Sequence, residues 1–218
     1  MSSQNQGNTL QDILKWEEEN RHSREIVTVL SGQNLSMGEV IGKVTKSFPV
    51  EGAAVTGNIG QGTVTGVSGG KDAKLGVYTL ECVATAENGG TFKVTAPDGD
   101  ALPDAVVGTA YANEQINFTI NDGDPDFSLG DKFTIEVTAG SGKVTAIDLD
   151  GVDGSRDAYG FVIADYDASL GDVDGVAVVR NAIIVPDDLV WPDGATTDQK
   201  AQALAELKAK GIVTRSEA

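Results

Sequence analysis

Hydrophobic and polar positions alternate in a strand-like pattern over the middle of the chain. Phe133, Ile135 and Val137 alternate with polar neighbours, and this period of two predicts a strand with one buried and one solvated face. Apolar runs bounded by Gly, Asn, Pro and Asp turn signals predict strands at 63–67, 77–84, 91–96, 115–120 and 132–138. We therefore expect an immunoglobulin-like β-sandwich over residues 59–147, although the Cys–Trp–Cys signature of true immunoglobulin domains is missing.

Continuous apolar runs lie on both sides of this segment. Two precede it, at 26–30 and 40–44, and three follow it, at 160–164, 176–180 and 182–185. Strands that are apolar on both faces must be covered by other elements, so we expect the early runs to pair with the late ones. The sequence thus predicts a discontinuous host domain made of residues 24–58 and 148–218, with 59–147 inserted in one of its loops.

One helix is predicted near the end of the chain. Thr196 and Gln199 have the spacing of a capping box, and Gly211 suits the position just after a helix. The expected apolar stripe contains Ala201, Leu204, Ala205 and Leu207. The fold class is therefore mainly β: a small β-rich host domain with one C-terminal α-helix, interrupted by the inserted sandwich.

The N-terminal residues do not show the strand pattern of the rest of the chain. Residues 1–23 hold a polar leader and a few apolar side chains near helical spacing, too few to offset the entropy of ordering the segment, so we expect a flexible arm. Its apolar groups have two possible uses, packing on this chain's own core or docking on a partner. The candidate contact residues are Leu10, Ile13, Leu14 and Trp16. The segment lacks the basic and apolar regions of a Sec signal.

Charge narrows the range of partners. The chain has 218 residues, with 16 basic and 33 acidic side chains and a formal net charge of −17. Such a field repels phosphate backbones, so nucleic acid is not an expected partner. No apolar run approaches the roughly 20 residues needed to cross a bilayer, so no membrane association is expected. The 27 glycines favour turn-rich β structure.

Candidate chemistry is sparse. The lone Cys82 and the lone His22 cannot form an internal disulfide or a zinc site, and the sequence has no nucleophile elbow, phosphate-binding loop or dinucleotide fingerprint. Asp122, Asp124 and Asp126 resemble the alternating ligands of a calcium loop, but the glycine at loop position six and the acidic residue at position twelve are missing. We therefore expect no enzyme, no bound metal and no cofactor.

Three stretches resemble the head decoration proteins of tailed bacteriophages, of the lambda gpD type. They are Arg24–Thr45, Ala158–Asp167 and Asp188–Lys200, and the most specific piece is Leu-Val-Trp-Pro-Asp at 189–193. The resemblance covers roughly residues 24–58 and 148–218. The middle segment departs from the short lambda form and looks like the β insertion that longer phage relatives carry.

The resemblance implies a structural protein of the virion. Such a protein is made in the host bacterial cytoplasm, binds the major capsid protein on the outer surface of an expanded head as a homotrimer, and stabilises the shell against DNA pressure. On this reading Leu10, Ile13, Leu14 and Trp16 contact the shell, while Trp191 and Pro192 lie at a trimer contact or support the entry to the final helix. The alternative is an adhesive or glycan-binding surface module, which the immunoglobulin-like character of the inserted β segment suggests.

Overall fold

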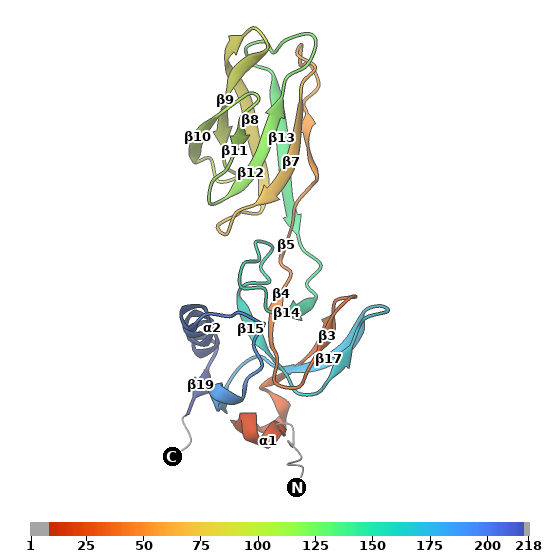
Figure 1. The fold of residues 1–218 in the computed structure, drawn as a ribbon, viewed down its shortest axis with the longest axis vertical. Coiled ribbons are helices and arrows are strands. Elements are labelled where there is room, and N and C mark those ends of the chain that lie inside the picture. The colour runs from red at the N-terminus through yellow and green to blue at the C-terminus, as the bar shows by residue number, and fades with distance from the viewer. Residues whose placement is uncertain (1–8, 216–218) are drawn as a thin grey trace. The chain divides into compact units, whose positions relative to one another are not determined.

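The computed structural model describes residues 9–215 and confirms a mainly β fold with one long helix near the C-terminus (Figure 1). The chain divides into two compact units. Unit 1 contains the described residues up to Thr45 and those from Gly142 onward, and unit 2 is Lys46–Ser141. A discontinuous host with an inserted β unit is therefore the observed organisation, with boundaries that differ from the expected 59 and 147.

Unit 1 is built on a closed barrel of five strands. In order around the barrel they are β14 (Val144–Ala146), β2 (Arg24–Val29), β17 (Val173–Val178), β15 (Ala158–Val162) and β4 (Val40–Lys43). Strand β17 runs antiparallel to β2, and β15 runs antiparallel to β4. The early apolar runs thus pair with the late ones, as predicted, and closure of the barrel leaves no open edge among these strands.

The barrel core explains why its strands are apolar throughout. Side chains from all five strands, including Val29, Ile41, Val144, Val162 and Ala177, are buried in one cluster. Glycine is needed where backbones meet closely, since a Cβ at Gly42 would overlap the carbonyl group of Ser155.

The other elements of unit 1 lie around the barrel. A three-stranded sheet has the order β1 (Leu14–Glu17), β18 (Ala182–Ile184) and β19 (Ile212–Thr214). A two-stranded sheet joins β16 (Tyr166–Asp167) to β3 (Asn34–Leu35). The helical elements are α1 (Leu10–Ile13), α2 (Thr197–Ala209), and two 3-10 turns, η1 (Glu19–Arg21) and η2 (Pro186–Asp188).

Helix α2 begins as the sequence predicts and packs differently. The Thr196 hydroxyl accepts a hydrogen bond from the Gln199 backbone N–H (3.3 Å), and the Thr196 N–H donates to the Gln199 side chain (3.0 Å), which completes the capping box. Gly211 has φ +79°, as expected for a residue that ends a helix. The buried positions are Ala203 and Leu207, whereas the predicted Ala201 and Ala205 are exposed. The packed face is therefore rotated from the predicted stripe.

Unit 2 is a two-layer β structure. Its strands are β5 (Lys46–Ser47), β6 (Glu51–Ala54), β7 (Thr63–Gly69), β8 (Gly76–Ala86), β9 (Gly89–Thr95), β10 (Ala101–Val106), β11 (Ala110–Tyr111), β12 (Ile116–Asn121) and β13 (Lys132–Ala139). Strand β6 pairs with β13 at one end and with β7 at the other, and so links the group β10-β9-β8-β13 to the group β7-β12-β11. The inward side chains of the two groups form one core, with Tyr78, Phe92 and Phe133 at its centre.

Pairing of short strands sets the boundaries between the units. Strands β5 and β6 were expected in the host, but both pair with β13 of unit 2. Strand β14 was expected in the insertion, but it pairs with β4 and β2 and completes the barrel of unit 1. Strands of two to four residues carry too little periodicity to be assigned from sequence.

Candidate functional site

The N-terminal segment is folded onto unit 1 over its described part, residues 9–23. Thr9 donates two hydrogen bonds to the Asp12 carboxylate, from its backbone N–H (2.7 Å) and its hydroxyl (2.8 Å), and these bonds lower the Asp12 pKa. The Ile13 carbonyl accepts a hydrogen bond from the Val185 N–H (2.9 Å), and the Ile13 side chain is fully buried. The expectation of a mobile arm over residues 1–23 is therefore wrong for these residues, while residues 1–8 lie outside the described part.

One buried side chain and one strand pair explain this ordering. Ile13 belongs to a core cluster with Ile184, Leu207 and Ile212, and Leu10 and Leu14 pack against the same cluster. Its methyl group occupies the space where a Cβ at Gly38 would otherwise stand. Burial of Ile13 and the backbone hydrogen bonds of β1 offset the entropy lost when the segment is ordered. A count of apolar residues does not include these backbone bonds and therefore predicted a flexible arm.

The register of the three-stranded sheet creates an exposed apolar row. Trp16 pairs with Ile183 across β1 and β18, and Ile183 pairs with Val213 across β18 and β19. Directly paired residues present their side chains on the same face of a sheet. Trp16 is 51% exposed and Val213 is 43% exposed, with Ile183 between them partly covered. We call these three residues the Trp16 row.

The residues after β1 fix the position of this row. Arg24 forms two hydrogen bonds with the Glu17 carboxylate (2.6 and 2.8 Å), and this pairing raises the Arg24 pKa. The Ser23 hydroxyl accepts from the Glu18 N–H (2.9 Å) and donates to the Asn181 carbonyl (2.6 Å). Strand β1 is thus held at its far end as well as at Ile13.

The four predicted contact residues therefore divide by face. Leu10, Ile13 and Leu14 point into the unit, and Trp16 points out of it. Sequence reasoning missed Ile183 and Val213, because an apolar run such as Ala182–Val185 does not show which of its side chains will be covered. The two consecutive apolar residues Ile212 and Val213 after the helix likewise do not show which of them is covered.

Trp191 and Pro192 lie at the entry to α2. Val190 pairs with β4 through its N–H to the Gly38 carbonyl (3.0 Å) and its carbonyl to the Val40 N–H (3.1 Å). Trp191 then packs, partly buried, on the core cluster that contains Ile13, and the Lys200 ammonium lies 5.9 Å from its ring centroid. The Pro192 carbonyl accepts from the Ala195 N–H (3.2 Å), a turn that leads into the cap. Trp191 and Pro192 thus lie where the chain enters α2.

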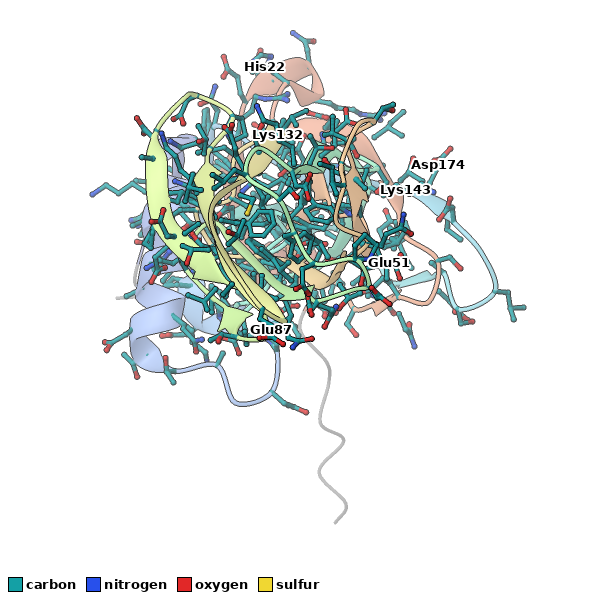
Figure 2. The ribbon with its side chains drawn as sticks, turned by 90° about the horizontal axis from the view of Figure 1, so that it is seen from above. His22, Glu51, Glu87, Lys132, Lys143 and Asp174 are labelled. Carbon is teal, nitrogen blue, oxygen red and sulfur yellow. The ribbon has the colours of Figure 1, made fainter. Side chains whose placement is uncertain are left out.

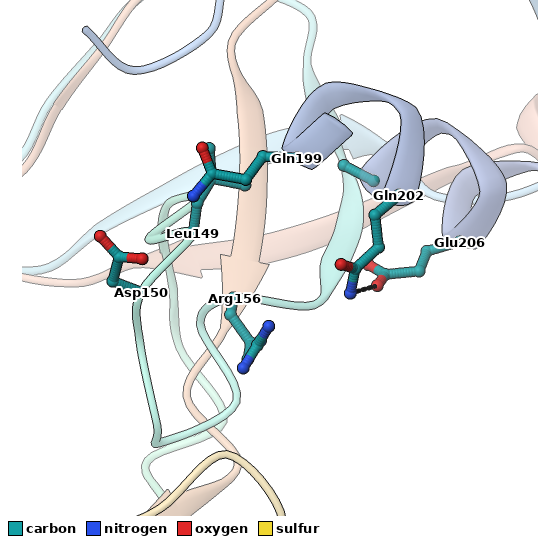
Figure 3. A pocket seen from close by; sticks show the side chains of 7 residues that line it. Leu149, Asp150, Arg156, Gln199, Gln202 and Glu206 are labelled. Atoms are coloured by element: carbon teal, nitrogen blue, oxygen red, sulfur yellow. Dashed lines mark hydrogen bonds between the residues drawn. The ribbon is translucent and has the colours of Figure 1, made fainter. Parts of the chain in front are cut away.

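A small polar pocket lies between α2 and the loop that joins β14 to β15 (Figure 3). Its volume is about 130 Å³, and its lining includes Asp150, Arg156, Gln199, Gln202 and Glu206. The Gln202 amide donates to one Glu206 oxygen (3.1 Å), and the Ala158 N–H donates to the other (2.7 Å), so these two side chains are engaged in structural bonds. No serine, cysteine or histidine lines the pocket.

The other candidate chemical groups are dispersed. Within residues 9–215, no three His, Cys, Asp or Glu side chains gather closely enough to hold a metal ion. Cys82 is buried, and burial raises the pKa of its thiol. His22 is exposed at the edge of unit 1 (Figure 2). None of the described helices has the length and apolar character needed to cross a bilayer.

The fold defines a class: a mainly β protein in which a small barrel unit carries an inserted β unit. The family model for bacteriophage lambda head decoration protein D matches residues 3–212, and the chain belongs to that family. The match confirms the resemblance and extends it across the insertion. The family is structural and non-enzymatic, and its place is the capsid surface of the virion.

No curated protein matches the chain. Two crystal structures of FlgL from Xanthomonas campestris match with 15% and 14% identity and TM-scores of 0.32 and 0.31. They cover 52% and 55% of this chain but only 34% and 33% of their own, so the chain spans about a third of their length. Similarity this low does not bear on function.

Proposed function

We propose that this protein binds the outer surface of an expanded phage head as a homotrimer, contacts the major capsid protein, and stabilises the shell against the pressure of packaged DNA. The observation that carries the proposal is the family match over residues 3–212. The trimer would occupy threefold or quasi-threefold positions, with unit 1 against the shell.

The Trp16 row is the proposed shell contact. Among the four predicted contact residues only Trp16 is exposed, while Leu10, Ile13 and Leu14 pack into unit 1. Strand β1 is an edge strand, since among the described residues it pairs with β18 alone. An edge strand can accept a strand from a neighbouring subunit through backbone hydrogen bonds, and an adjacent tryptophan adds buried area to such a contact.

A trimer would strengthen this contact through multivalency. Once one copy is bound, the other two bind at a high effective concentration, so modest single contacts give very slow release. The net charge of −17 favours solubility of many copies before assembly and opposes contact with the genome.

Direct binding to emptied, expanded heads tests the proposal. Imaging of the mixture is expected to show protein at threefold positions, and Trp16→Ala is expected to weaken binding by more than tenfold, the loss of about 1.4 kcal/mol or more. Val77→Ala is the matched control, because Val77 is 44% exposed and lies in unit 2. Unchanged affinity of Trp16→Ala would contradict the contact. Polysaccharide binding without head binding would contradict decoration and favour an adhesive module.

A further inference from the structure

The turn that joins β1 to β2 has an unusual backbone. Asn20 and Arg21 are consecutive, and both have left-handed dihedral angles, with φ of 59° and 60°. Four non-glycine residues of the described chain have positive φ, and Arg21 is the one among them that is not an asparagine. Asparagine tolerates this conformation, whereas the Cβ of an arginine crowds the following carbonyl oxygen. The arrangement in which β1 folds back onto its own chain is therefore strained at this turn.

We propose that residues 9–17 exchange between copies of this chain, so that β1 of one copy pairs with β18 of the next copy. The connection, residues 18–23, would open from a tight turn into an extended segment. The proposal rests on the homotrimer proposed above and names the contact that holds its copies together.

The place where this segment binds already fits it, because the structure shows that place filled. The Ile13 carbonyl accepts a hydrogen bond from the Val185 N–H (2.9 Å), and the Ile13 side chain is buried in the cluster that contains Ile184. The Glu17 carboxylate bonds to Arg24, which lies beyond the turn in β2. None of these contacts includes the turn, so the segment of a second copy makes the same contacts.

Opening the turn costs little. Residues 18–22 are all exposed, so little packing is lost when they extend. The hydrogen bonds that hold the turn lie at or near the surface, where water can replace the lost partner. They join the Glu18 N–H to the Ser23 hydroxyl (2.9 Å), the His22 N–H to the Glu19 carbonyl (3.4 Å), the Asn181 amide to the Glu18 carboxylate (3.0 Å) and Arg180 to the His22 carbonyl (2.9 Å).

Within a trimer the two arrangements compete on nearly equal terms. On its own chain the segment binds at a high effective concentration, which favours the closed arrangement of a single copy. In a trimer the binding place on the next copy is tethered as well, so this advantage largely disappears. The strain at Asn20 and Arg21 then decides in favour of exchange.

The length of the connection permits a ring. Six extended residues span about 20 Å. The segment and its binding place are two different patches, so their contact is heterologous, and such contacts close into a ring when the rotation between copies fits. In a cyclic trimer every segment and every binding place is used. A copy could leave only by withdrawing Ile13 from the core of its neighbour, so release is slow.

Cysteine crosslinking in the full chain distinguishes the two arrangements. Trp16 pairs with Ile183 across β1 and β18, and paired residues at a Cα separation of about 5 Å suit a disulfide. The double variant Trp16→Cys/Ile183→Cys, oxidised mildly after purification in reductant and then unfolded, is expected to run as covalent trimers. A disulfide within one chain, which leaves only monomers after unfolding, would overturn the proposal. The native Cys82 is 2% exposed and lies in unit 2, and the two single variants control for other crosslinks.

A change in the turn provides the second measurement. In the double-cysteine background, Arg21→Gly removes the left-handed cost and is expected to lower the crosslinked fraction at least about fivefold, with unchanged circular dichroism. Asn88→Gly is the matched control, because Asn88 also has a positive φ (52°) but lies in unit 2, and no change is expected. An Arg21→Gly variant that crosslinks as fully as its parent would overturn the role of the turn and with it the proposal.

Sedimentation of the wild type separates this proposal from the function on which it rests. A wild-type trimer whose double-cysteine variant gives only disulfides within one chain would overturn the exchange and leave the trimer standing. A wild-type monomer that still decorates heads would overturn the exchange and the trimer, but not decoration. Linked trimers that fail to bind heads would support the exchange and overturn decoration.

Discussion

Replacing Ile13 by alanine tests whether the N-terminal segment belongs to the fold of unit 1. The side chain is fully buried against Ile184, Leu207 and Ile212, far along the chain from it. Substitutions of isoleucine by alanine in well-packed cores cost about 2–5 kcal/mol, through lost apolar burial and the cavity left behind. Gly38, which lies beside the Ile13 methyl group, has no side chain that could fill this cavity. We expect a loss of about 3 kcal/mol in the free energy of unfolding of unit 1.

Tryptophan fluorescence gives a selective assay. The chain has two tryptophans, Trp16 and Trp191, and both lie in unit 1, so their emission follows the unfolding of this unit alone. With a urea dependence of about 2 kcal/mol per molar, a loss of about 3 kcal/mol lowers the midpoint by about 1.5 M.

Gln11→Ala supplies the control on the same segment, because the Gln11 side chain is exposed. Its free energy of unfolding is expected to differ from that of the wild type by less than about 0.5 kcal/mol. Equal midpoints for Ile13→Ala and the wild type would show that residues 10–17 do not contribute to the folded unit. The description of Ile13 as an anchor would then be refuted.

Three further predictions concern the other parts of the chain. Joining Thr45 to Gly142 through a short glycine linker, in place of unit 2, is expected to preserve cooperative unfolding by tryptophan fluorescence, because the Val44 N–H already bonds to the Lys143 carbonyl (2.9 Å). Removing 59–147 instead deletes strand β14 and is expected to abolish that transition; equal behaviour of the two deletions would contradict the barrel. Thr196→Ala removes the cap of α2 and is expected to cost about 0.5–2 kcal/mol in the same assay, whereas Thr197→Ala, in the first turn, is expected to cost less. In unit 2, burial acts to raise the pKa of Asp131, but hydrogen bonds from the backbone N–H groups of Ser128, Ile59 and Gly60 outweigh it and leave that pKa below its ordinary value. The ionised Asp131 therefore stabilises the folded state fully above the unfolded-state pKa of about 3.9, and this stabilisation is lost as pH falls through the lower folded-state pKa. In acid, the amide exchange rates of residues 59–60 are expected to approach those of Asp131→Asn. A constant difference between the two proteins at every pH would contradict this.

The sequence alone predicted the elements whose signals are local. Period-two alternation located β13, the spacing of Thr196 and Gln199 located the start of α2, and apolar runs on both sides of the insertion predicted that early and late strands pair. These signals work because strand alternation and helix capping depend on residues a few positions apart. The family resemblance depended on the same local stretches.

Tertiary structure decided which side of each element is covered. Ile13 and Trp16 are three residues apart, yet Ile13 packs against Ile184, Leu207 and Ile212, whereas Trp16 lies in β1 on the exposed face of the sheet. The same long-range pairing joins Trp16 to Ile183 and Val213, and places strands β5, β6 and β14 in units opposite to those expected. Burial is a property of neighbours that are distant in the chain, so no count along the sequence could assign it.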